Sequence, residues 1–73
     1  MEMPEYDKEL RKRGNTIDLI IDELPRYLVT FKEPVYKKGG NVKQKICVYP
    51  GWWHSLDGWN YEDKQIERWE LIK

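Results

Sequence analysis

The sequence predicts a small α+β domain: an antiparallel β-meander or SH3-like partial barrel of four to five short strands, preceded by one or two short helices. From Arg26 onward, apolar and polar residues alternate, which is typical of half-buried strands. Turn residues rich in glycine separate these alternating stretches. Before Pro25, four apolar residues have helical spacing.

Length and composition exclude several classes of protein. A chain of 73 residues forms one small domain and is too short for a Rossmann fold or a TIM barrel. Aromatic residues make up 14% and the net charge is +0, which argues against a disordered chain. No stretch approaches the roughly 20 apolar residues of a membrane span, and the polar N-terminus does not resemble a signal peptide. One Cys and one His exclude a disulfide or a Cys/His zinc site, so we expect no metal and no cofactor, and an unpaired Cys indicates a cytoplasmic location. We also expect no membrane contact.

We expect two parts, a polar N-terminal helix or arm over residues 1–14 and a single α+β domain over residues 15–73. Pro4 suits a first helical turn and Gly14 suits a helix end. The stretch that follows is ambiguous. Ile17, Ile20, Ile21 and Leu24 have helical spacing up to Pro25, whereas residues 16–21 also alternate like a strand. Both interpretations remain open from sequence.

The strands begin after Pro25. Alternating residues predict strands from Tyr27 and from Val42, joined by a Gly39-Gly40 turn, with a bulge or an edge position at Pro34. A third strand over residues 52–56 should return through an Asp57-Gly58 hairpin, and a last strand should run over residues 66–72. We expect Trp69 and Ile46 on the core face of late strands.

Several short segments resemble a family of very small phage and prophage domains of unknown function. The matching segments are Asp22-Glu23-Leu24-Pro25, Tyr27-Leu28-Val29-Thr30, Ile46-Cys47-Val48-Tyr49, Gly51-Trp52-Trp53 and Arg68-Trp69-Glu70-Leu71. The chain departs from the family pattern in two places: the leader lacks its usual first Trp, and Leu71-Ile72-Lys73 replaces a closing proline pair. The resemblance implies a phage or prophage origin and a small β-rich fold, and it implies no catalytic residue.

The residues that invite an enzymatic interpretation are better explained structurally. On a strand, Ser55 and Asp57 point to one face and His54 to the other, so they cannot form a catalytic triad. We expect Cys47 to be a buried, unreactive thiol. The acidic residues near the C-terminus are expected to be a solvated surface rather than a cation site; they are Glu62, Asp63, Glu67 and Glu70. The chain is therefore expected not to be an enzyme.

Positive charge is concentrated in one hairpin. Residues 26–45 carry six bases and one acid, and the hairpin over residues 32–45 holds four candidate binding lysines, Lys37, Lys38, Lys43 and Lys45. Basic strands next to aromatic residues are typical of single-strand nucleic-acid binders. Solvated lysines that protect a strand edge from aggregation, and a surface for an acidic protein, are the other two interpretations.

Aromatic residues supply the second candidate surface. Trp52 and Trp53 are consecutive on a strand, so they cannot both face one core. Trp53 shares a face with Ser55 and Asp57 and is expected to be exposed, with Trp59 and Tyr61 beside it as contacts for a protein partner. Trp52 is expected in the core.

These observations predict a phage-encoded binding protein that blocks or redirects a host protein, such as a defence component, through protein–protein interaction. The alternative is a nucleic-acid-binding module that uses the basic hairpin. A homodimer is a further way for so small a chain to bury apolar surface.

Overall fold

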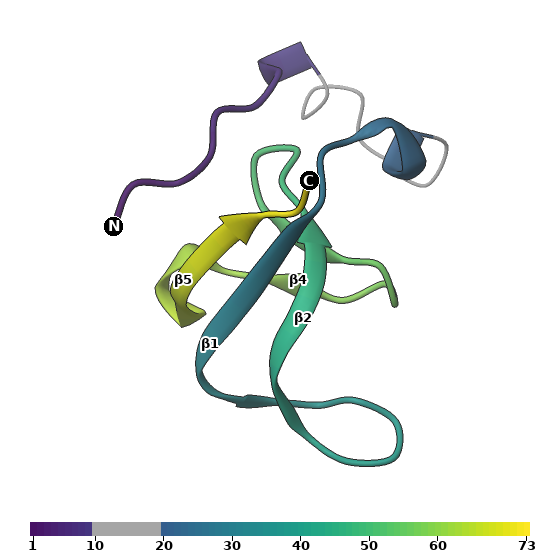
Figure 1. Ribbon diagram of the computed structural model, residues 1–73, viewed down its shortest axis with the longest axis vertical. Helices are drawn as coiled ribbons and strands as arrows, with labels where there is room; N and C mark the ends of the chain where they lie inside the picture. The colour runs from purple at the N-terminus through teal and green to yellow at the C-terminus, as the bar shows by residue number, and fades with distance from the viewer. Residues whose placement is uncertain (10–19) are drawn as a thin grey trace.

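The computed structural model describes residues 1–9 and 20–73. The strands of a five-stranded antiparallel sheet lie between Tyr27 and Leu71 (Figure 1). The strands are β1 (Tyr27–Val35), β2 (Val42–Val48), β3 (Trp53–Ser55), β4 (Asn60–Tyr61) and β5 (Ile66–Leu71). The order in the sheet is β4-β3-β2-β1-β5, so the first four strands form a meander and β5 returns to pair with β1. The predicted antiparallel meander is confirmed, and the sheet is not closed into a barrel.

The helical half of the α+β prediction is not confirmed. No α-helix lies wholly within residues 1–9 and 20–73, which hold two 3-10 turns, η2 (Ile21–Glu23) and η3 (Asp63–Gln65). Residues 10–14 of the expected N-terminal helix or arm and residues 16–19 of the ambiguous stretch 16–24 lie outside the described part of the chain, and residues 1–7 are not helical. Leu24 is extended, with φ −86° and ψ 147°, because the ring of Pro25 disfavours helical backbone at the preceding residue.

One face of the sheet carries an aromatic core. Cross-strand partners share a face, and the pairs Tyr27 with Cys47 and Trp53 with Tyr61 all point into this core. The buried members are Tyr27, Val29, Phe31, Cys47, Tyr49, Trp53, Tyr61 and Ile66. Trp53 lies at the centre, with ring centroids 5.7 Å from Tyr27 and 4.6 Å from Tyr49. Burial of large rings therefore supplies much of the apolar area that so short a chain needs.

The predicted exposure of Trp53 is wrong. The side chain of Trp53 is 0% exposed, whereas Trp52 is half-buried and donates a hydrogen bond from Nε1 to Asn60 Oδ1 at 2.9 Å. The polar neighbour on the face of Trp53 does not require water, because Ser55 Oγ hydrogen-bonds to Asp57 and to the backbone of Trp59. A polar group that is hydrogen-bonded can be buried at little cost in free energy. The polar residues on the same face as Trp53 therefore did not indicate that this face is exposed.

Two irregularities in strand pairing explain the other differences. Between Thr30 and Val35 the β1–β2 register shifts, in the stretch that contains Pro34, as expected. The β1–β5 register also shifts, from Thr30 with Arg68 to Phe31 with Ile66. This bulge in β5 lets both Ile66 and Trp69 face the core although they are three residues apart.

The expectations for Trp69 and Ile46 have different outcomes. Trp69 is half-buried and packs against the core. Ile46 is 41% exposed, so its predicted core position is wrong. Ile46 pairs with Leu28 on the face of the sheet opposite to the aromatic core, since its neighbour Cys47 points inward.

The N-terminal segment packs against the core. Met3 and Tyr6 lie against it, and Trp53 Nε1 donates a hydrogen bond to Met3 Sδ at 3.4 Å. Trp69 Nε1 donates to the carbonyl oxygen of Glu2 at 2.9 Å. Residues 2–6 therefore belong to the folded unit.

Candidate functional site

An ion pair between a buried lysine and a partly exposed aspartate lies at the end of the β3–β4 hairpin. Lys45 points from β2 to the core face, its side chain is 4% exposed, and its Nζ lies 2.8 Å from Oδ2 of Asp57. The ammonium also faces two aromatic rings, 5.8 Å from the centroid of Trp59 and 5.4 Å from that of Tyr61. Lys45 was predicted to belong to an exposed basic surface, and this is wrong because the Asp57-Gly58 turn brings a carboxylate to it.

The carboxylate of Asp57 is held on both oxygens. Its Oδ1 accepts a hydrogen bond from Ser55 Oγ, and its Oδ2 accepts one from Lys45. Burial alone would raise the pKa of Asp57, but these hydrogen bonds outweigh it and hold the pKa below its ordinary value. Burial alone would lower the pKa of Lys45, but the hydrogen bond to Asp57 contributes to a net upward shift. Both groups therefore stay charged near neutral pH and neutralise each other.

This polar cluster does not have the geometry of a nucleophilic active site. Ser55 is fully buried, and its hydroxyl is engaged by Asp57 and by the backbone of Trp59. His54 points to the other face, where its Nδ1 lies 2.6 Å from Asn60 Oδ1. The ion pair with Asp57 keeps Lys45 protonated, so Lys45 cannot act as a base toward Ser55. The cluster instead fixes the hairpin that positions Trp59.

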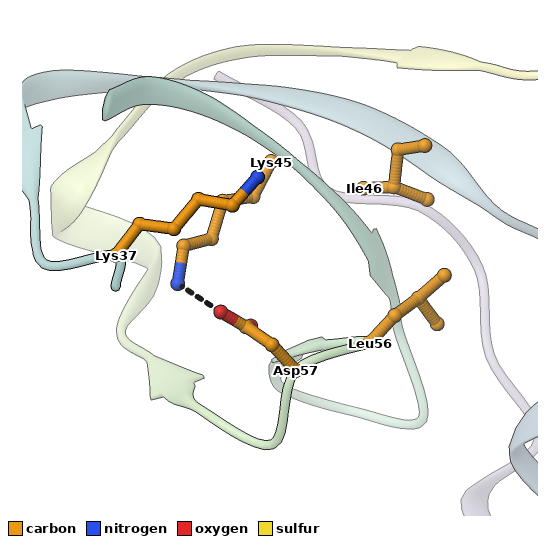
Figure 2. A pocket seen from close by; sticks show the side chains of 5 residues that line it. All are labelled: Lys37, Lys45, Ile46, Leu56 and Asp57. Atoms are coloured by element: carbon orange, nitrogen blue, oxygen red, sulfur yellow. Dashed lines mark hydrogen bonds and ion pairs between the residues drawn. The ribbon is translucent and has the colours of Figure 1, made fainter. Parts of the chain in front are cut away.

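A hollow lies beside the ion pair, at the boundary between the two faces of the sheet. It is lined by Lys37, Lys45, Ile46, Leu56 and Asp57, and Figure 2 shows Ile46 and Leu56 on one side of it. Ile46 is 41% exposed and Leu56 is 39% exposed. The hollow therefore has a charged side and an apolar side.

An exposed aromatic pair adjoins this hollow. Tyr36 is 57% exposed and Trp59 is 47% exposed, and their ring centroids are 5.5 Å apart. They come from two different connections, the β1–β2 loop and the β3–β4 turn. Because Lys45 contacts Trp59 and also lines the hollow, the pair and the hollow form one continuous surface. We call it the hairpin-edge surface; its exposed members are Tyr36, Lys37, Ile46, Leu56 and Trp59.

The edge of β2 is open at the same place. β3 pairs with β2 only at Cys47 and Val48, and the amide of Leu56 adds one hydrogen bond to the carbonyl of Ile46 at 3.2 Å. The chain then turns away through Gly58, whose φ is +94°. Among residues 1–9 and 20–73, the part of β2 from Val42 to Lys45 therefore pairs with β1 alone.

Three lysines of the hairpin remain available. Lys37, Lys38 and Lys43 are exposed, and no ion pair joins them to any described residue. The loop that carries Lys37 and Lys38 extends away from the sheet (Figure 1). The hairpin-edge surface is therefore flanked by positive charge that no carboxylate of the described residues neutralises.

The structure separates the aromatic residues predicted to contact a partner. Trp59 is exposed, but Trp53 is 0% and Tyr61 is 8% exposed, so these two belong to the core. Within the described residues, Oη of Tyr61 is buried without a hydrogen-bond partner. Sequence reasoning missed Ile46, Leu56 and the pairing of Tyr36 with Trp59. The alternation in this strand places Lys43 and Lys45 on the face opposite to Ile46 and so favoured a core position for Ile46, and no local signal joins Tyr36 to a residue 23 positions away.

Cys47 and the acidic residues have structural explanations. Cys47 is fully buried in the core, and burial raises the pKa of its thiol to about 12, so the predicted inert thiol fits its environment. In the part of the chain that the structure describes, no three His, Cys, Asp or Glu side chains come together as metal ligands. No helix in that same part is long and apolar enough to cross a membrane.

Comparisons with protein-family models, with curated proteins and with solved structures gave no match to this chain.

Proposed function

We propose that this chain is a phage-encoded binding protein that blocks or redirects a protein of the bacterial host, for example a component of a defence system. The observation that supports binding is the hairpin-edge surface. Two large apolar residues and an aromatic pair are exposed there together, next to lysines that form no ion pair with any residue in 1–9 or 20–73. Aromatic anchors beside apolar and charged groups are the composition that protein interfaces favour.

Energetics support a role for this surface outside the fold. Tyr36 and Trp59 each leave about half of the side chain in water, so they contribute less to stability than the buried rings do. An exposed Trp that fills a pocket of a partner can contribute roughly 2 kcal/mol or more to binding. The phage context comes from the resemblance of the short segments around Asp22–Pro25 and Gly51–Trp53.

Site-specific photo-crosslinking tests this proposal. A benzophenone amino acid would replace Tyr36 in one variant and Lys64, whose side chain is 81% exposed in η3, in a control variant. After irradiation in host lysate, we expect a discrete adduct from position 36 and none from position 64. Leu56→Ser and Trp59→Ser should each remove the adduct, whereas Lys73→Ser should not. Equal adducts from both positions, or an adduct insensitive to Leu56→Ser and Trp59→Ser, would contradict the proposal.

A second candidate function has one specific observation in its favour. The exposed Tyr36–Trp59 pair lies beside exposed lysines, and stacking platforms with positive charge are how single-stranded nucleic acids are bound. Fluorescence anisotropy with a thymidine oligonucleotide at low salt tests it, with Lys37, Lys38 and Lys43 changed to Gln. Binding that weakens steeply with salt and is lost in this variant would support nucleic acid. Lys45 is left unchanged because it is buried and ion-paired.

A further inference from the structure

We propose that the open edge of β2 takes up an extended acidic segment of the partner as an added strand beside Val42–Lys45. This inference depends on the proposed function, because it names the chemistry that the hairpin-edge surface recognises.

The backbone of β2 leaves hydrogen-bonding groups open at this edge. The carbonyl of Ile46 faces the β3 side, because it accepts a hydrogen bond from Leu56. Backbone groups two residues apart on a strand face the same edge, so the N–H and C=O of Gln44 also face this edge. β3 has ended there, and no described strand pairs with Gln44 from that side. An extended peptide that adds to an open edge gains main-chain hydrogen bonds of this kind.

The two faces of β2 determine what the added strand must carry. Lys43 and Lys45 share the face on which Lys45 reaches Trp59, whereas Gln44 and Ile46 share the other face. Side chains of an added strand alternate in the same way. One set would meet Lys43 and the exposed aromatic pair, and the other set would meet Ile46 and Leu56.

Charge selects acidic residues for the first set. Lys45 is neutralised by Asp57, but Lys37 and Lys43 have no carboxylate partner among the described residues. Apolar residues fit the second set, because Ile46 and Leu56 are 41% and 39% exposed and adjoin the hollow (Figure 2). The occupant is thus an extended segment in which acidic and apolar residues alternate.

The same features disfavour the other occupants. Pairing the edge with that of a second copy would bring the basic hairpins together, and like charges on facing strands are destabilising. A nucleic acid has no backbone amides to pair with Gln44, and Ile46 and Leu56 offer nothing to its phosphates.

Defined peptides test the inference by fluorescence anisotropy. The probe is a labelled ten-residue peptide of alternating Glu and Val. The matched probes carry Lys in place of Glu, carry Ser in place of Val, or have every backbone amide N-methylated; a thymidine oligonucleotide is the fifth probe. We expect only the Glu-Val peptide to bind well. Equal binding of the Lys, Ser or N-methylated peptide, or tighter binding of the oligonucleotide, would overturn the inference.

Variants of the protein locate the site. Gln44→Pro removes the edge amide, should fold because proline is tolerated on an open edge, and should abolish binding, with Gln44→Ala as its matched control. Lys37→Gln and Lys43→Gln should each weaken binding about two- to five-fold, as expected for exposed ion pairs, and Lys64→Gln should not. Hydrogen exchange of the Gln44 amide should slow about tenfold when the peptide is present at ten times its Kd. Unchanged exchange at Gln44 despite binding would place the peptide elsewhere and contradict the inference.

The outcomes separate this inference from the proposed function. If position 36 traps a host protein but no peptide protects Gln44, the binding function stands and strand addition fails. If neither occurs, both fail. A dimer of the free protein in sedimentation that Gln44→Pro dissociates would assign the edge to a second copy and overturn the inference.

Discussion

The ammonium of Lys45 and the carboxylate of Asp57 are 2.8 Å apart, and the lysine side chain is 4% exposed. The positive charge of Lys45, which the sequence places in a basic hairpin, is thus neutralised by Asp57 inside the protein. Of the four lysines predicted to bind a partner, Lys37, Lys38 and Lys43 are the exposed ones.

Replacing one member of this ion pair should destabilise the fold. Asp57→Asn leaves the Lys45 ammonium buried without its counter-ion, and we expect a loss of about 1–3 kcal/mol in the free energy of unfolding. The double variant Lys45→Met/Asp57→Asn removes both charges and should recover much of this loss. Urea denaturation of the four proteins in the cycle measures the coupling. A double variant no more stable than Asp57→Asn would show that the charge of Lys45 is not the cause.

The contribution of the ion pair should depend on pH at both extremes. The pKa of Asp57 is lowered in the folded state, so its contribution is present above the unfolded value near 3.9 and is lost as pH falls through the lower folded value. The pKa of Lys45 is raised, so its contribution is present below about 10.4 and is lost as pH rises through the higher folded value. The stability difference between wild type and Asp57→Asn should therefore shrink in strong acid and in strong alkali. A difference independent of pH would contradict the assignment.

Cys47 should resist thiol reagents in the folded protein. It is fully buried, and burial raises its pKa to about 12, so almost no thiolate exists at neutral pH. Reaction with Ellman's reagent should be slow in native buffer and fast in guanidinium chloride. The unfolded thiol ionises near pH 8.5, so stability should fall as pH rises above that value, and Cys47→Ala should reduce this fall. Fast native labelling would show that the core opens locally.

The two adjacent tryptophans should respond differently to truncation. Trp53→Ala removes the centre of the core and should cost about 3–5 kcal/mol, enough to unfold a small domain. Trp52→Ala removes a half-buried ring and one hydrogen bond to Asn60, so we expect a folded protein with a smaller loss. Thermal unfolding followed by circular dichroism compares them. A silent Trp53→Ala would contradict the register of β3.

The contact between the ends of the chain should be measurable. Trp69→Phe keeps an aromatic ring but removes the hydrogen bond from Nε1 to Glu2, which is worth about 0.5–1.5 kcal/mol. We expect lower stability and faster proteolysis within residues 1–9. Trp59→Phe is the control, because the ring of Trp59 lies on the hairpin-edge surface. Equal proteolysis in both variants would show that this bond does not hold the segment.

Local signals predicted the turns well. The Asp57-Gly58 hairpin and the bulge near Pro34 follow from backbone preferences that need no tertiary context. The inert environment of Cys47 also follows from its place on a strand.

The faces of the strands depended on distant partners. Trp53 can face the core because the polar residues on its face are hydrogen-bonded. Ser55 donates to Asp57, and Asp57 also accepts from Lys45, twelve residues away. The bulge that turns Ile66 and Trp69 to one face depends on the pairing of β5 with β1. Neither relation leaves a periodic pattern in the sequence, so Trp53 and Ile46 were placed on the wrong faces.

The sheet order also has a consequence during synthesis on the ribosome. β1 lies between β2 and β5, so one side of β1 stays unpaired until β5 has been translated. The hydrogen bond from Trp69 to the carbonyl oxygen of Glu2 also cannot form before then. Contacts so distant in sequence slow folding, because the intervening chain must be closed into a loop first. A nascent chain that has emerged only as far as the β3–β4 hairpin therefore leaves the β5 side of β1 unpaired, and chaperones and proteases can engage β1 there until β5 covers it.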